Sequence, residues 1–325
     1  MKGKTISITD INQLISSIQA GDRFSLARGI TLLESKKADH QEVAEELLEQ
    51  SLPLSGKSFR IGITGIPGIG KSTFIDSLTQ ELVQSGQKVA ILSIDPSSHL
   101  SGGSILGDKT RMNNISNHPN VFIRPSPSGT ILGGVAQKTR EILILCEAAG
   151  YDHILVETVG IGQSESAVKG MTDLFLLLVM AGTGDDLQGI KRGVMEMADL
   201  ILVNKADGEN KQRSMEYATE LQSLMTLFTH TKGWKIPVFP ISSLEKGRMQ
   251  EVLETLNEYQ KYLAEENRLE KMRNAQNLVW FRESLGENMI GLIQRKMIEF
   301  ADVEKQVESG DITIRKAVSQ ILKEL

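Results

Sequence analysis

The sequence predicts an α/β fold, with a mostly parallel central sheet flanked by helices and a helical extension at each end. Between about residues 58 and 246, short apolar, β-prone runs alternate with helical segments. Outside that range the apolar residues recur only at the three- and four-residue spacing of amphipathic helices. Because continuously apolar strands separated by helices are typical of a parallel sheet covered on both faces, this alternation indicates the fold class.

Residues 1–57 are predicted to form an N-terminal helical arm. Gly21-Asp22 interrupts its first helical stretch, and Pro53 and Gly56 end its second. The apolar residues at helical intervals are Leu14, Ile15, Ile18, Leu26, Ile30 and Leu33, followed by Val43, Leu47 and Leu48.

Residues 58–246 are predicted to form the α/β domain. Several apolar runs in this range have the length and composition of buried strands. These runs are 59–64, 89–95, 121–124, 153–158, 174–180, 200–204 and 238–241.

Residues 247–325 are predicted to form a C-terminal helical arm. Apolar residues follow helical stripes over 249–263, 285–297 and 314–322. A segment of this length is too short to bury a large core of its own, so its helices must pack on the α/β domain or on another subunit. A helical cap on the same chain and a dimerisation arm are both compatible with the pattern.

The composition excludes several classes of protein. The 325 residues carry 36 Lys+Arg against 41 Asp+Glu, a net charge of −5, which argues against a nucleic-acid binder that neutralises phosphates. A single cysteine, Cys146, and five scattered histidines exclude a disulfide framework and a histidine-rich metal store. The longest apolar run, 174–181, is far shorter than the roughly 20 residues of a membrane-spanning helix. With no hydrophobic leader after Met1, no membrane association and a cytoplasmic location are expected.

The strongest motif is a glycine-rich segment, Gly65-Ile66-Pro67-Gly68-Ile69-Gly70-Lys71-Ser72-Thr73, which fits the pattern GxxxxGK[ST]. It follows a predicted strand and precedes a predicted helix, the context that a phosphate-binding P-loop requires. Glycines let successive backbone amides point at phosphate oxygens, and the helix N-terminus adds partial positive charge. We expect Lys71 to reach the β- and γ-phosphates and Ser72 to ligate Mg²⁺. The fold class is thereby narrowed to a P-loop NTPase.

A second motif predicts which base is bound. Asn204-Lys205-Ala206-Asp207 follows an apolar strand and fits N-K-x-D, the pattern of guanine-specific P-loop proteins. A carboxylate at Asp207 can accept from the ring N1–H and the exocyclic amine of guanine, whereas adenine would leave it buried and unpaired. Ser242-Ser243-Leu244, after the last predicted strand, is placed to contact the guanine oxygen through its backbone. The predicted ligands are therefore GTP and GDP.

Three acidic residues are candidates for binding Mg²⁺ together with Ser72. Asp95 and Glu157 each end a predicted strand, and Asp108 lies in a glycine-rich segment between two strands. In an α/β sheet the carboxyl ends of the strands meet at the edge where ligands bind. A single acid at a strand end is more often a cap or turn residue, but three at one edge beside a P-loop favour a metal site.

Taken together, these motifs resemble one family, the MeaB/ArgK-type G-protein chaperones of adenosylcobalamin-dependent acyl-CoA mutases, above all methylmalonyl-CoA mutase. The most particular stretch is SGGSILGDKTRM at residues 101–112. The other matching stretches are 21–23, 26–28, 30–35, 65–73, 95–98, 157–165, 184–191 and 204–207. The resemblance covers most of the chain and becomes weaker after about residue 245.

The resemblance implies a switch-driven GTPase that works as a homodimer through its C-terminal arm. Its implied partners are an acyl-CoA mutase and the adenosyltransferase that loads the cobalamin, and GTP hydrolysis is coupled to delivery of intact cofactor and removal of damaged cofactor. It also implies that Asp95, Asp108 and Glu157 surround the magnesium ion and the water. Lys191, in the loop 182–191, is implied to stabilise transition-state charge when the partner docks, alongside Lys71.

The residue after the Glu157–Gly160 element predicts slow intrinsic hydrolysis. Ile161 stands where Ras-like proteins place a glutamine that orients water, and an aliphatic side chain cannot do so. Three alternatives are weighed against this chaperone. A P-loop kinase would normally prefer ATP, a nickel-insertion GTPase should show Cys and His ligands near the P-loop, and a scaffold that binds nucleotide without hydrolysis is distinguished only by assay.

Overall fold

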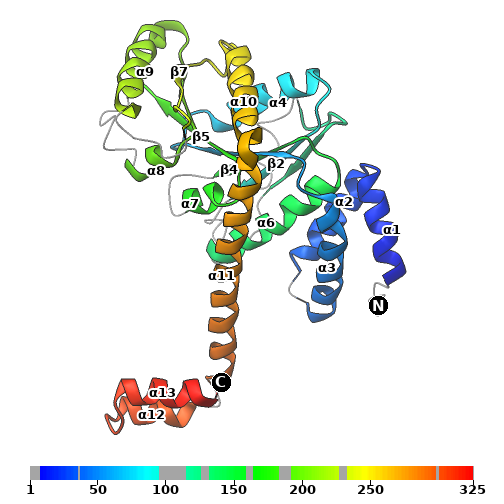
Figure 1. Cartoon of the computed structure of the whole chain (residues 1–325), viewed down its shortest axis with the longest axis vertical. Helices are drawn as coiled ribbons and strands as arrows, with labels where there is room; N and C mark the ends of the chain where they lie inside the picture. The colour runs from blue at the N-terminus through cyan, green and yellow to red at the C-terminus, as the bar shows by residue number, and fades with distance from the viewer. Residues whose placement is uncertain are drawn as a thin grey trace. The chain divides into compact units, whose positions relative to one another are not determined.

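The computed structural model describes residues 8–35, 37–94, 115–125, 132–158, 164–182, 192–226, 233–297 and 300–324. The chain divides into two compact units, Met1–Arg273 and Asn274–Leu325. The boundary between them falls inside helix α11 (Arg268–Lys296). Figure 1 shows the elements of each unit.

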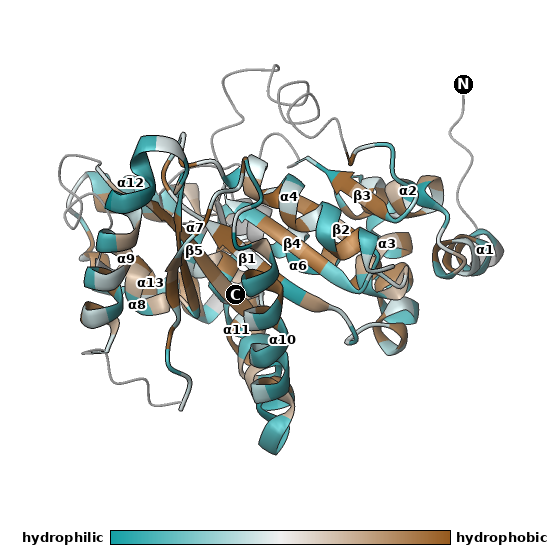
Figure 2. Ribbon diagram, turned by 90° about the horizontal axis from the view of Figure 1, so that it is seen from above, coloured by the Kyte–Doolittle hydropathy of each residue, from teal (hydrophilic) through white to brown (hydrophobic). Residues whose placement is uncertain are grey.

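The first unit is built on a parallel sheet, as the sequence predicts. Within the described ranges it has seven strands in the order β3-β2-β4-β1-β5-β6-β7, and every neighbouring pair is parallel. The strands are β1 (Phe59–Thr64), β2 (Val89–Ile94), β3 (Val121–Arg124), β4 (His153–Thr158), β5 (Leu174–Met180), β6 (Leu200–Asn204) and β7 (Val238–Pro240). Figure 2 shows the brown, hydrophobic residues concentrated along these strands.

Helices cover both faces of the sheet, which explains why its strands are apolar on both sides. One face packs against α4 (Lys71–Gln84) and α10 (Met249–Ala264), with Phe74 and Leu256 among the buried contacts. The other packs against α6 (Leu132–Ala148) and α9 (Lys211–Met225), with Leu143 and Leu221 buried. Two short helices, α7 (Ser164–Lys169) and α8 (Arg192–Met197), complete this second layer.

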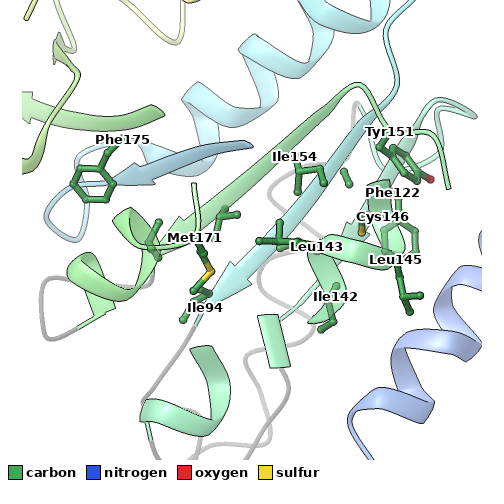
Figure 3. Close-up of a cluster of buried hydrophobic side chains, with 14 of the residues drawn as sticks. Ile94, Phe122, Ile142, Leu143, Leu145, Cys146, Tyr151, Ile154, Met171 and Phe175 are labelled. Carbon is green, nitrogen blue, oxygen red and sulfur yellow. The ribbon is translucent and has the colours of Figure 1, made fainter. Parts of the chain in front are cut away.

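The N-terminal helices pack against α6 and are part of the same core. They are α1 (Ile8–Gln19), α2 (Arg23–Leu33) and α3 (Ala38–Ser51). Gly29 lies where they meet, because a Cβ there would come within 3.3 Å of Ile18 and Leu145 and 3.4 Å of Leu47. Figure 3 shows part of this core, with Leu145 beside Cys146, which is fully buried as its apolar helix predicts. The arm is thus a fixed layer of the first unit.

Polar contacts hold the N-terminal helices to the edge of the sheet as well. Asp22 caps α2 by accepting from the Ser25 amide at 2.9 Å. At the other end of the helix, Glu34 pairs with Arg124, the last residue of the edge strand β3. Because these groups lie at opposite ends of α2, the helix is fixed in its position along the sheet.

The second unit, taken by itself, is helical, as the apolar spacing predicts. It contains the later part of α11, α12 (Ala301–Glu308) and α13 (Ile314–Glu324). A small core of Phe300, Val303 and Ala317 joins α12 to α13. Helix α12 was not predicted from the sequence as a separate element, because Val303 is its single fully buried residue.

A charged cluster lies at the amino-terminal edge of the sheet. The Arg273 guanidinium binds both carboxylate oxygens of Asp173, at 2.6 and 2.8 Å, and donates to two backbone carbonyls just before β1. Beside it, the Glu147 carboxylate receives two hydrogen bonds from Arg60, at 2.8 and 2.9 Å. Both carboxylates are fully buried, so each depends on its arginine.

We predict that Arg273→Met destabilises the fold, because it leaves the buried Asp173 carboxylate without its charged partner. The expected loss is about 3 kcal/mol in the free energy of unfolding, measured by urea denaturation. Lys271→Met, an exposed position in the same helix, is the control and should change stability by less than about 0.5 kcal/mol. Equal effects of the two substitutions would contradict this role.

Candidate functional site: a nucleotide site at the carboxyl edge of the sheet

The predicted site residues follow strands that end at the same edge of the sheet. The glycine-rich loop follows β1, Glu157 is in the last turn of β4, and Asn204 ends β6. Ser242 comes just after β7. Because all the paired strands are parallel, these four segments converge at one edge, where α/β proteins bind their ligands.

The glycine-rich loop has the backbone conformation that the motif predicts. Gly65, Gly68 and Gly70 have φ values of 155°, 78° and 99°, a region that other residues rarely adopt. Gly65 and Gly70 also lie against neighbouring groups, since added Cβ atoms would come within 2.6 Å of the Leu178 carbonyl and 2.7 Å of the Asn204 amide nitrogen. Gly70 is the N-cap of α4 and no side chain caps the helix there, which leaves its first amides for an anion.

Lys71 is held inside this loop. Its ammonium group donates to the carbonyl of Gly65 at 2.7 Å and to that of Ile66 at 3.3 Å. Burial lowers the pKa of the Lys71 ammonium, and the nearby Glu157 carboxylate opposes that shift. A phosphate group would add negative charge and favour the charged form further, so the loop holds a cation that gains from binding phosphate.

Ser72 and Glu157 supply oxygen atoms in a position that fits a magnesium ion. The Ser72 hydroxyl donates to the Glu157 carboxylate at 3.3 Å. Two adjacent ligands of an octahedral Mg²⁺ lie about 3 Å apart when each is about 2.1 Å from the metal. Within the described ranges no group of three His, Cys, Asp or Glu residues could hold a metal. The other predicted groups, Asp95, Asp108 and Lys191, lie outside the described residues.

Asn204 connects the phosphate loop to the loop after β7. Its amide nitrogen donates to the Ile69 carbonyl at 2.8 Å. Its amide oxygen accepts from the backbone N–H of Ser243 at 3.1 Å and from the Ser243 hydroxyl at 2.7 Å. Asn204 is 2% exposed, so this side chain uses its buried donor and acceptor to join two loops.

Asp207 and Ser242 form a second contact beside Asn204. The Ser242 hydroxyl donates to the Asp207 carboxylate at 2.6 Å, which orients the predicted base-reading group. Lys205 has a φ of 60°, so the loop turns sharply between Asn204 and Asp207. The neighbouring Leu244 is 78% exposed. The structure therefore brings the two predicted guanine motifs into direct contact.

Two further contacts reach this site from α4 and were not identified from the sequence. Ser77 donates to the Ser243 carbonyl at 2.6 Å, and Glu81 pairs with Lys246 at 3.1 Å. The two α4 residues are four apart and share one helix face. That spacing is a local signal, but nothing in it names partners more than 160 positions away.

The fold and this edge define a P-loop GTPase. The chain belongs to the MeaB family: residues 26–297 match the family described as methylmalonyl-CoA mutase-associated GTPase MeaB.

Relatives support the same assignment. A protein of Mycobacterium tuberculosis named a probable GTPase is 43% identical over 96% of this chain and 94% of its own length. The mouse protein named methylmalonic aciduria type A homolog, mitochondrial, is 39% identical over 96% of this chain and 79% of its own. A crystal structure described as that of an LAO/AO transport system kinase is 32% identical, with a TM-score of 0.78 over 98% of this chain and 99% of that one.

None of the helices that the structure describes combines the length and the apolar character needed to cross a bilayer.

We predict that Gly70→Ala lowers the affinity for GDP at least roughly tenfold, because its Cβ would displace the Asn204 amide. Gly86→Ala is the matched control. It has a similar φ, of 82° against 99°, at the other end of α4, but its Cβ would meet nothing within 4 Å. Both should lose a similar amount of stability, whereas calorimetric GDP titration should show a normal dissociation constant for Gly86→Ala. A normal constant for both variants would contradict the prediction.

Proposed function

We propose that this MeaB-family GTPase serves an adenosylcobalamin-dependent acyl-CoA mutase, with methylmalonyl-CoA mutase as the first candidate. In this role it gates loading of the cobalamin and protects or reactivates the mutase. The observation that carries the GTPase part is the contact between phosphate loop and base loop through Asn204. The client is supported by the family's description and by the name of the mouse relative. A cobalamin adenosyltransferase is proposed as a further partner, and the cytoplasm as the location.

The proposed chemistry assigns a role to each residue at the sheet edge. The amides of the glycine-rich loop and Lys71 bind the β- and γ-phosphates. Ser72 and Glu157 hold Mg²⁺, with Asp95 and Asp108 as the other acids, and the ion would neutralise charge on the phosphates. Asp207 reads the guanine ring N1–H and amine, and Ser242-Ser243-Leu244 contacts its oxygen. Glu157, at the end of β4, also orders the attacking water.

Partner-dependent activation follows from two residues outside the described ranges. Ile161 cannot orient a water molecule, so hydrolysis by the isolated protein is proposed to be slow. Docking of the mutase is proposed to order the loop of Lys191 and to bring that ammonium group to the developing charge on the phosphates.

We predict that the mutase accelerates single-turnover GTP hydrolysis at least roughly tenfold and that Lys191→Ala removes this acceleration. The intrinsic rate of Lys191→Ala should stay close to that of the natural protein, because Lys191 acts only in the complex. Lys205 of the base motif is an unsuitable control, so exposed Lys271→Ala, far from the predicted site in sequence, is used. Equal rates with and without the mutase, with Lys191→Ala silent in both, would refute partner activation.

We also propose that the second unit mediates homodimerisation. On α13, Ala317 and Ile321 face the small core shared with α12. Ile314, Val318 and Leu322, at i, i+4 and i+8, form a separate stripe that is 71%, 49% and 60% exposed. Exposed apolar stripes of this kind favour association with another apolar surface. A second copy of the chain is the occupant proposed here.

We predict that Val318→Asp converts a dimer into a monomer, because it places a charge in the proposed interface. The measurement is molar mass by light scattering at micromolar concentration. Ser319→Asp is the control, since it adds the same charge at the next exposed position and should leave the dimer intact. A natural protein that is monomeric, or a Val318→Asp variant that remains dimeric, would contradict the proposal.

The kinase alternative remains relevant because the similar crystal structure is described as that of a transport system kinase. A kinase would transfer the γ-phosphate to an acceptor other than water. Production of free phosphate in step with GDP, with no labelled acceptor from γ-labelled GTP, distinguishes the GTPase from it. The nickel-insertion alternative is disfavoured by the single cysteine, Cys146, which is buried in the core.

A further inference from the structure

One face of α4 holds the loop after β7 at two points. The hydroxyl of Ser77, which is 5% exposed, donates to the Ser243 carbonyl at 2.6 Å. One turn further along the helix, the Glu81 carboxylate pairs with the Lys246 ammonium at 3.1 Å. The first contact is buried and the second is partly exposed, so the hydrogen bond from Ser77 is expected to be the stronger constraint.

The loop needs such support because part of its backbone is strained. Lys246 and Arg248 have φ values of 55° and 62°, which non-glycine residues adopt at a cost of about 1 kcal/mol or more each. Conformations of this kind persist only where surrounding contacts enforce them. Around this loop the enforcing contacts include Ser77, Glu81 and, on the other side, Asn204.

These contacts close a ring that starts and ends on one segment. From the Ile69 carbonyl, hydrogen bonds run through Asn204 to Ser243 and from the Ser243 carbonyl to Ser77. Ile69 lies in the phosphate loop and Ser77 in the helix that the loop opens. The ring therefore fixes the distance between the phosphate-binding amides and the loop after β7.

We propose that Ser77 and Glu81 are positioning residues for guanine recognition, an inference that rests on the proposed role of Ser242-Ser243-Leu244 at the guanine oxygen. They touch no nucleotide. They hold the base loop at the distance from the phosphate loop that one guanine nucleotide spans. Loss of either contact lets the loop move away from the guanine oxygen while the phosphate amides stay in place.

The test compares GDP with 6-thioguanosine diphosphate in calorimetric titrations. The analogue keeps the N1–H and the amine of guanine and replaces the oxygen by sulfur, a weaker acceptor. Ser77→Ala should lower the affinity for GDP roughly tenfold and that for the analogue less than about threefold. Ser85→Ala, at the exposed end of α4, is the control and should change neither. An equal loss for both nucleotides, or no loss of GDP affinity, would overturn the proposal.

Charge reversal tests the second contact. Glu81→Lys should weaken GDP binding about two- to threefold, and adding Lys246→Glu should restore it, because the pair is re-formed with opposite signs. Failure of the double variant to recover would remove Glu81 from the proposal.

Asp207→Asn tests the base site itself, since an asparagine amide can donate to the second oxygen of xanthine. It should shift the preference from GDP to xanthosine diphosphate. If it does and Ser77→Ala has no selective effect, the positioning role alone fails. If it does not, the base-site assignment and the positioning role both fail.

Discussion

The buried amide of Asn204 is the interaction on which the nucleotide site depends. Its nitrogen binds the phosphate loop at Ile69 and its oxygen binds the base loop at Ser243. An asparagine suits this position because one side chain offers both a donor and an acceptor, whereas an aspartate would place a second acceptor against the Ile69 carbonyl. The close approach of Asn204 also explains Gly70, where any Cβ would meet the amide.

The parallel sheet places this interaction where it can act. Every paired strand ends at the same edge, so loops that are 135 positions apart in sequence, at Ile69 and Asn204, come within hydrogen-bonding distance. The opposite edge is held by Arg273 and its buried carboxylates, which fix the starts of β1 and β5. Chemistry is thereby separated from structural support: the carboxyl edge carries the strained loops, and the amino edge carries the paired charges.

Local patterns in the sequence predicted the strands and the motif residues well. Six-residue apolar runs such as 59–64 and 153–158 coincide with β1 and β4, because burial on both faces leaves no polar positions. Helix α11 was predicted only from residue 285 onward, since it begins at Arg268 with mostly polar residues. The contacts of Ser77, Glu81 and Arg273 could not be predicted, because each joins residues about 90 to 220 positions apart and depends on the assembled fold. The N-terminal arm was predicted as helices, but its union with α6 needs the position of Gly29.

The most direct test of this account is the affinity of the natural protein and of Asn204→Ala for GDP and ADP, measured by calorimetry. The account predicts that the natural protein binds GDP at least about a hundredfold more tightly than ADP, since ADP leaves Asp207 unpaired. It predicts that Asn204→Ala loses at least roughly tenfold in GDP affinity and narrows that ratio. Equal affinities of the natural protein for GDP and ADP, or an Asn204→Ala variant that binds GDP normally, would contradict the view of one guanine site held together by a single amide.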